Sequence, residues 1–189
     1  MPAARDTVLE SATQLLASNP RASMGDVAAA AGMSRATLHR LFPSRDDLVE
    51  AIGLLAVDRI DAAFAAARLD KGTAPEALTR LVEAVLPAVH QFAFLMSEAQ
   101  IASSPTLLER DQILQLEVER MLRRGQEEGS IRYDLPVAWL AYALTGLLLG
   151  AEEASRRGAI APRDTVRLIV ETFMRGAGAT RKSPGSPVS

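Results

Sequence analysis

Between positions 24 and 47 the sequence is MGDVAAAAGMSRATLHRLFPSRDD, a pattern that predicts two short helices, a tight turn between them and the start of a third helix. Ser23 is placed to cap the first helix, and Asp26, three residues later, completes a capping box. Gly32 supplies a backbone conformation in the turn that a residue with a Cβ would resist. Ser34 caps the second helix, which ends at a Phe-Pro pair because the residue before a proline avoids the helical region.

The second helix, Arg35–Leu41, has two unlike faces. Leu38, Leu41 and Phe42 recur at helical spacing and are expected in a small core. The remaining face is basic and is formed by Arg35, Ala36, His39 and Arg40, with Thr37 at its boundary. A short helix with a basic outer face is typical of a DNA-binding helix-turn-helix, but an ordinary helical hairpin has the same spacing. The spacing alone leaves both interpretations open.

A third helix begins behind the Phe-Pro pair, where Ser44 and Asp47 form a second capping-box pattern. This part of the chain resembles the N-terminal domain of the tetracycline-repressor (TetR) family of bacterial transcription regulators. The resemblance rests on Asp26–Gly32, Met33-Ser34, Thr37-Leu38, Phe42–Arg45 and Asp47-Leu48. The chain departs from the family at His39, where an aromatic residue, most often tyrosine, is usual, and at Arg45, where lysine is usual. The specific match covers roughly the first fifty residues.

The resemblance implies that these helices bind a palindromic operator in double-stranded DNA. Candidates for contacts with base edges are Arg35, Ala36 and Arg40. Candidates for contacts with phosphates are Thr37, His39, Ser44 and Arg45. The predicted DNA-binding set also includes the two capping residues Ser23 and Ser34.

The composition fits a helical, cysteine-free protein without a basic field. Of the 189 residues 48% are apolar, leucine and alanine dominate, and no alternating β-branched run predicts a strand. The absence of cysteine excludes disulfides and thiolate metal sites, and two histidines are a poor inventory for metal chemistry. We expect no cofactor. The formal net charge of -2 argues against a general nucleic-acid coat protein. Any DNA binding therefore depends on where individual arginines point.

The whole chain predicts an all-α fold of about nine helices. Residues 1–50 are expected to form a three-helix DNA-binding domain, residues 51–176 a helical ligand-binding and dimerisation domain, and residues 177–189 a disordered tail. The helix Arg45–Arg68 is expected to pack in both domains and so to link them mechanically. The other helices are expected at Ala4–Ser18, from Pro75 onward with a kink or division at Pro87, and at Thr106–Glu128, Pro136–Arg157 and Pro162–Arg175.

The last two helices, Pro136–Arg157 and Pro162–Arg175, are too apolar to be left exposed, which predicts a homodimer with a four-helix bundle at its seam. Ala143, Gly146 and Gly150 would allow close packing there. An aromatic and methionine-rich segment predicts a small apolar or aromatic effector. Candidate ligand contacts are Val57, Ile60, Phe64, His90, Phe92, Phe94, Met96, Met121 and Trp139. Placement in an ordinary core explains five of them at least as well when each is taken singly, namely Phe92, Phe94, Met96, Met121 and Trp139. The alternative for His90 is a polar residue near the core or lining a cavity.

The predicted function is a ligand-responsive, dimeric transcription regulator, a repressor that a small apolar effector releases from its operator. A helical small-molecule-binding scaffold or an enzyme without operator binding is the alternative. The enzyme has no support in the sequence, which contains no phosphate-cradling glycine loop, nucleophile elbow or Ser/His/Asp pattern. The N-terminus carries no apolar core of signal-peptide length and no stretch predicts a membrane span, so we expect the protein in the cytoplasm.

Overall fold

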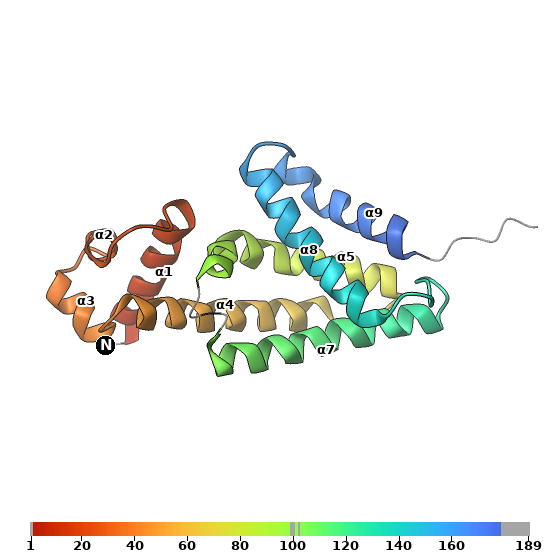
Figure 1. Ribbon diagram of the computed structural model, residues 1–189, viewed down its shortest axis with the longest axis horizontal. Coiled ribbons are helices and arrows are strands. Elements are labelled where there is room, and N and C mark those ends of the chain that lie inside the picture. Colours follow the sequence, from red (N-terminus) through yellow and green to blue (C-terminus); the bar gives the residue numbers. More distant parts are fainter. Residues whose placement is uncertain (1, 99–100, 102, 179–189) are drawn as a thin grey trace, which may run out of the picture. The chain divides into compact units, whose positions relative to one another are not determined.

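The computed structural model describes residues 2–98, 101 and 103–178 (Figure 1). Within these residues the chain forms eight α-helices, two short 3-10 helices and no strand, which confirms the predicted all-α class. The elements are α1 (Pro2–Ser18), α2 (Met24–Ala30), α3 (Arg35–Leu41), α4 (Arg45–Ala67), α5 (Ala74–Phe92), η1 (Ala93–Ser97), α7 (Pro105–Glu127), α8 (Val137–Arg156), η2 (Pro162–Asp164) and α9 (Thr165–Ala177). The predicted tail lies outside the described residues except for Ala177, which ends α9, and Gly178.

Three prolines act differently from a simple helix start or stop. Pro136 is the N-cap of α8 and not its first residue. Pro162 opens the 3-10 helix η2, and α9 begins only at Thr165. Pro87 lies inside α5, which continues to Phe92, so of the two predicted effects the division of this helix does not occur.

Packing contacts divide the chain into two compact units. The first consists of Met1–Ala66 and Val85–Leu114, and the second of Ala67–Ala84 and Gln115–Ser189. These units group segments by contact, whereas the predicted domains group them by role. The predicted domain boundary after residue 50 therefore stays a prediction.

In the first unit, α1, α2 and α3 are grouped around the first turns of α4 (Figure 1). Their core contains Val8, Ala12 and Leu16 from α1, Val27 from α2, Leu38 from α3, and Leu48 and Ile52 from α4. Phe92 of α5 and Leu95 of η1 belong to the same apolar cluster. The helix-turn-helix therefore shares one continuous core with α4, α5 and η1, and burial of that core is the main term that stabilises it.

Polar contacts in the first unit tie α4 to α5 and α7. Arg110 of α7 forms ion pairs with Asp58 (2.7 Å) and with Asp61, which lies almost one turn further along α4. Arg59 of α4 donates a hydrogen bond to the side-chain oxygen of Gln91 at 2.5 Å. These contacts fix the rotation of α4 about its own axis, because each partner faces a defined side of the helix.

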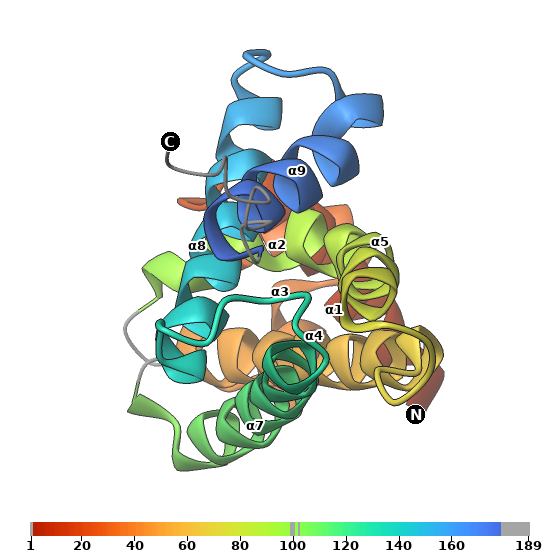
Figure 2. The ribbon, with the colours of Figure 1, turned by 90° about the vertical axis from the view of Figure 1, so that its right-hand side faces the viewer.

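In the second unit, α8 and α9 form a helical hairpin whose arms lie side by side in both views (Figure 1, Figure 2). Their buried side chains include Leu140 and Leu144 of α8 and Ile169 and Phe173 of α9. The connection after α7 returns to the end of this hairpin. The N–H of Arg132 donates to the carbonyl of Ala177 at 2.8 Å, and Ile131 pairs with Gly178. Ala177 and Gly178, the first two residues that the sequence assigned to the tail, thus pack against the connection after α7.

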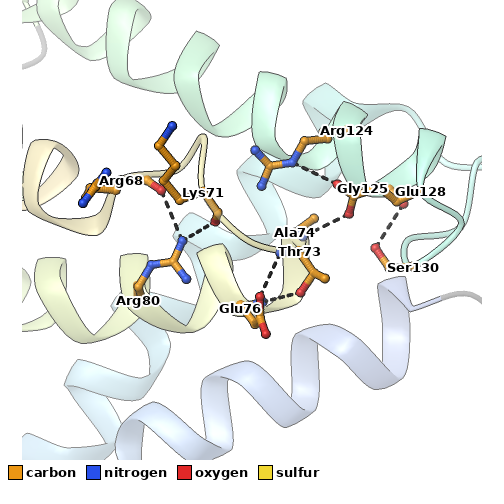
Figure 3. A network of polar contacts seen from close by, with 10 residues as sticks. All are labelled: Arg68, Lys71, Thr73, Ala74, Glu76, Arg80, Arg124, Gly125, Glu128 and Ser130. Carbon is orange, nitrogen blue, oxygen red and sulfur yellow. Dashed lines mark hydrogen bonds and ion pairs between the residues drawn. The ribbon is translucent and has the colours of Figure 1, made fainter.

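One guanidinium closes the turn from α4 to α5 (Figure 3). Arg80 donates to the carbonyls of Ala67 (2.9 Å), Arg68 (3.1 Å) and Lys71 (2.5 Å). Arg68 has a φ of 47°, a left-handed conformation that costs free energy at a residue with a Cβ. The three hydrogen bonds offset that cost, because helix-end carbonyls need partners. They fasten the end of α4 to the first turns of α5.

An 18-residue window within the stretch Ala74–Met96 has a mean hydropathy of 1.2, so this stretch could cross a membrane by length and composition alone. Core helices of water-soluble proteins meet the same criterion. Three charged residues, Glu76, Arg80 and Glu83, lie in the first turns of this stretch. Its last turns supply part of the apolar cluster of the first unit, so we interpret the stretch as core.

Candidate nucleic-acid interface

α2 begins at a complete capping box. The hydroxyl oxygen of Ser23 accepts the N–H of Asp26 (3.3 Å), and the Asp26 carboxylate accepts the N–H (2.8 Å) and the hydroxyl (2.7 Å) of Ser23. Gly32, between α2 and α3, has a φ of 64°, so the reversal occurs at the residue without a Cβ. These contacts confirm the predicted cap and turn, and together they set the direction in which α3 leaves α2.

α3 is held at both ends and along one side. The Ser34 hydroxyl oxygen accepts the N–H of Thr37 (3.1 Å), and the N–H of Phe42 donates to the carbonyl of Leu38 (2.8 Å). The side chains of Leu38 and Phe42 are 0% and 1% exposed, as the sequence predicts. A helix of seven residues does not persist in isolation, so this burial decides both its existence and its orientation.

The outer face of α3 is open to solvent, again as predicted. Arg35, Ala36, His39 and Arg40 are exposed, and Thr37 is half-buried. A guanidinium nitrogen of Arg40 donates to the Thr37 hydroxyl at 3.4 Å, which aligns the arginine along the helix. The two arginines present forked donors that suit base edges and phosphates. This face therefore has the chemistry of a nucleic-acid contact.

His39 is oriented by the backbone beyond α3. Its Nδ1 lies 3.1 Å from the carbonyl oxygen of Pro43. Because a carbonyl oxygen only accepts, Nδ1 carries the hydrogen in this contact. Nε2 is then the ring atom left to act outward, as an acceptor in the neutral ring and as a donor in the protonated ring.

Two predicted phosphate contacts have partners within the chain. The N–H and hydroxyl of Ser44 donate to the Asp47 carboxylate at 2.9 and 2.6 Å, which confirms the second capping box. Arg45 donates to Glu98 at 2.6 Å and to the carbonyl of Pro20 at 3.0 Å. The side chains of Arg45 and Glu98 are only 33% and 15% exposed. Arg45 thus joins the start of α4 to the turn before α2 and to the end of η1, and we do not retain it as a phosphate contact.

Sequence reasoning missed Arg5 of α1. Its guanidinium carbon lies 4.5 Å from the centroid of the Phe42 ring, and Nη1 donates to the carbonyl of Leu41 at 3.3 Å. Arg5 therefore covers the end of α3 and supplies a partner for a carbonyl that the helix leaves unpaired. The hydrogen bond joins residues 36 positions apart, so no local pattern indicates it.

Comparison with known proteins identifies this arrangement. Residues 8–52 match the family described as "Bacterial regulatory proteins, tetR family". The HTH-type transcriptional repressor LfrR of Mycolicibacterium smegmatis is 32% identical over 154 residues, which cover 82% of this chain and 80% of that protein. The chain belongs to the TetR family.

Two further comparisons extend the likeness beyond the first domain. The HTH-type transcriptional regulator NfxB of Pseudomonas aeruginosa is 29% identical across 87% of this chain and 89% of its own length. The crystal structure of LfrR from Mycobacterium smegmatis in complex with proflavine has a TM-score of 0.78 at 29% identity, and covers 92% of this chain and 96% of its own. This TetR-family chain is accordingly a DNA-binding transcription regulator whose first helices form the family's helix-turn-helix.

The predicted ligand contacts do not share one environment. Phe64, Phe92 and Met121 are buried, Val57, Ile60 and Phe94 are half-buried, and His90 is exposed. Met96 and Trp139 are 68% and 61% exposed, so neither lines an interior and we do not retain them as ligand contacts. Helical spacing could not show this, because it does not tell which side of an apolar helix is covered. In the described part of the chain, no group of three or more His, Asp or Glu side chains is placed to hold a metal ion.

The capping box of α2 also has a consequence for pH. The hydroxyl and the backbone N–H of Ser23 hold the pKa of Asp26 below its ordinary value of 3.8, and the charge of Arg35 lowers this pKa further. The folded protein thus keeps the carboxylate charged to a lower pH than the unfolded chain does. Its contribution to the free energy of unfolding is complete above the unfolded-state pKa and is lost as the pH falls through the folded-state pKa.

We predict that Asp26→Asn lowers the free energy of unfolding at pH 7, and that this deficit shrinks as the pH falls below about 4. Asparagine has the shape of the carboxyl group without its charge, so it resembles the protonated aspartate. Urea unfolding between pH 7 and pH 3 measures the effect. Asp111→Asn, which removes an exposed carboxylate of α7, is the control. A deficit of the same size at every pH would contradict the role of the charge.

Proposed function

We propose that this TetR-family regulator is a dimeric repressor that binds a palindromic operator through the outer face of α3. The observation that carries the proposal is an exposed basic face on the same short helix whose other face is buried by Leu38 and Phe42. A chain with a formal charge of -2 has no general attraction for DNA, so recognition depends on the placement of single side chains. The protein acts in the cytoplasm and catalyses no reaction.

Within α3 the side chains divide into two groups by their chemistry. Arg35, Ala36 and Arg40 are assigned to base edges, because an arginine can donate two hydrogen bonds to guanine and an alanine methyl can contact thymine. Thr37 and His39 are assigned to phosphates, to which a hydroxyl and an Nε2 can bind without selecting a base. The serines whose hydroxyls serve as helix caps, and so place the helices, are Ser23, Ser34 and Ser44.

The face of α8 opposite its buried side supports the dimer. Trp139 and Tyr142 are large aromatic residues left exposed there, and Gly146 and Gly150 continue the same face. A Cβ at either glycine would meet nothing within 4 Å, so the chain leaves this strip open. Contiguous exposed aromatic surface is a mark of an interaction site. A second copy related by a two-fold axis would cover it, and the same symmetry matches a palindromic operator.

A small, flat aromatic effector is proposed to bind in the first unit against α4, α5 and η1. The related LfrR structure contains proflavine, a molecule of this kind. In this chain Ile60 of α4 and Phe94 of η1 pack against the apolar cluster of the first unit, to which Phe92 of α5 belongs. Phe64 lies one turn beyond Ile60 on α4. An aromatic ligand can stack among such side chains.

The contacts of Arg45 provide a route from this effector to the DNA-binding helices. Glu98 caps the end of η1, and its carboxylate holds Arg45, which also holds the carbonyl of Pro20 before α2. A ligand that moves η1 therefore alters the contact that places the start of α4. The ligand shifts the equilibrium between the DNA-binding arrangement of these helices and the alternative one only by the difference in its affinity for the two arrangements. A ten-fold loss of operator affinity needs about 1.4 kcal/mol of such coupling.

We predict that Arg40→Ala relaxes the choice of base at one position in each half-site, by roughly 1–3 kcal/mol if the contact is bidentate. Binding to the preferred duplex and to its single-base variants, at several salt concentrations, measures this. Arg120→Ala removes an exposed arginine of α7 and is the matched control. If Arg40→Ala instead weakens binding equally for every duplex and flattens the salt dependence, Arg40 contacts a phosphate.

We predict that Gly146→Leu weakens the dimer, because a branched side chain on the exposed strip of α8 would separate the two copies. Sedimentation over a range of concentrations gives the dimer dissociation constant. Gln112→Leu adds the same side chain at an exposed position of α7 and should leave that constant unchanged. Unchanged association of Gly146→Leu would place the seam elsewhere, and a monomer at micromolar concentration would exclude the dimer.

We predict that an aromatic effector weakens binding to the preferred duplex and that saturating duplex weakens effector binding by the same factor. Calorimetry measures both, with proflavine as the first probe. Because flat aromatic molecules also bind DNA, titration into the duplex alone is the necessary control. Glu98→Gln keeps the shape of the carboxylate but not its charge, and should bring the factor towards one. A probe that binds equally with and without operator would be a bystander.

A further inference from the structure

The guanidinium of Arg35 lies directly against the backbone of α2. A Cβ placed on Gly25 would be 2.5 Å from Nη2 of Arg35 and 2.8 Å from its Cζ and Nε. A Cβ atom essentially never lies this close to a non-bonded heavy atom, so the present position of Arg35 requires a residue without a side chain at position 25. Arg35 is nevertheless exposed, which leaves part of its fork free to act outward.

Charge supports the same placement. Asp26 follows Gly25, and its carboxylate is fixed by the N–H and hydroxyl of Ser23. The negative charge therefore has a defined position next to the surface on which Arg35 rests, and attraction between the two favours the observed orientation. Arg35 is the first residue of α3, so α2 determines the direction of the first cation on its outer face.

We infer that Gly25 is a specificity-determining position, which acts by setting the orientation at which Arg35 meets a base edge. The inference rests on the proposed function, in which α3 contacts operator bases. An arginine side chain carries much rotamer entropy, and holding it against a flat surface before binding reduces what is lost in the complex. Gly25 itself touches no base and is a positioning residue.

A methyl group at position 25 separates this role from a structural one. Alanine favours helix over glycine, so Gly25→Ala should leave α2 as stable as before or more stable. The atoms that the new Cβ meets are the far end of a flexible side chain, which moves away without any shift of backbone. The substitution should therefore displace Arg35 and leave the fold intact. A change in base discrimination without a loss of stability could then not be attributed to unfolding.

The test is a double-mutant cycle of Gly25→Ala and Arg35→Ala. For each protein, the affinity for the preferred duplex and its single-base variants is measured, together with the free energy of unfolding. Gly25→Ala should reduce discrimination at the base pair that depends on Arg35 by several-fold. The upper limit is the discrimination that one bidentate contact supplies, roughly 5- to 150-fold. In the Arg35→Ala background the same substitution should change nothing, because the side chain through which it acts is gone.

Each other outcome has a distinct meaning. Unchanged discrimination in Gly25→Ala overturns the inference and leaves the proposed function standing. An equal loss with and without Arg35 also overturns it, because the effect would then pass through α2 itself. If the unsubstituted protein shows no preference among duplexes, the proposed function fails and this inference fails with it.

Discussion

Burial of one side of α3 is the constraint on which the rest of the interface depends. Leu38 and Phe42 are almost entirely removed from solvent, in a core shared with α1 and α4. Because a helix this short has no stability of its own, the packing of its buried face against the core fixes its orientation. The outward direction of Arg35 and Arg40 follows from it. Arg5, stacked on the Phe42 ring, covers the end of the helix where the core stops.

Arginine has two separate uses in this protein. Arg45 and Arg110 are engaged by carboxylates within the first unit, and Arg80 by backbone carbonyls within the second. The arginines of α3 form no ion pair among the described residues. Arg40 donates to the Thr37 hydroxyl, and Arg35 lies against Gly25, near the Asp26 carboxylate. This division explains how a chain with net negative charge can present a basic face. It also explains why the position of a cation along the sequence does not reveal its role.

The features that the sequence predicts correctly are local. The caps at Ser23 and Ser34 and the left-handed turn at Gly32 each depend on residues within a few positions, so their chemistry is visible in the order of residues. The features it misses join distant positions, as Arg45 and Glu98 do across 53 residues. The exposure of Trp139 escaped prediction for another reason. An evenly apolar helix does not show which of its sides the rest of the chain will cover.

Binding of a two-fold symmetric duplex by two copies of α3 can be tested by selection from a random pool of duplexes. The account predicts enrichment of an inverted repeat whose half-sites are spaced by one helical turn of DNA, about 10–10.5 base pairs, or a multiple of it. Enrichment must disappear when Arg35 and Arg40 are both replaced by alanine. Recovery of sequences without symmetry, or of no preferred sequence at all by a folded dimer, would contradict the account.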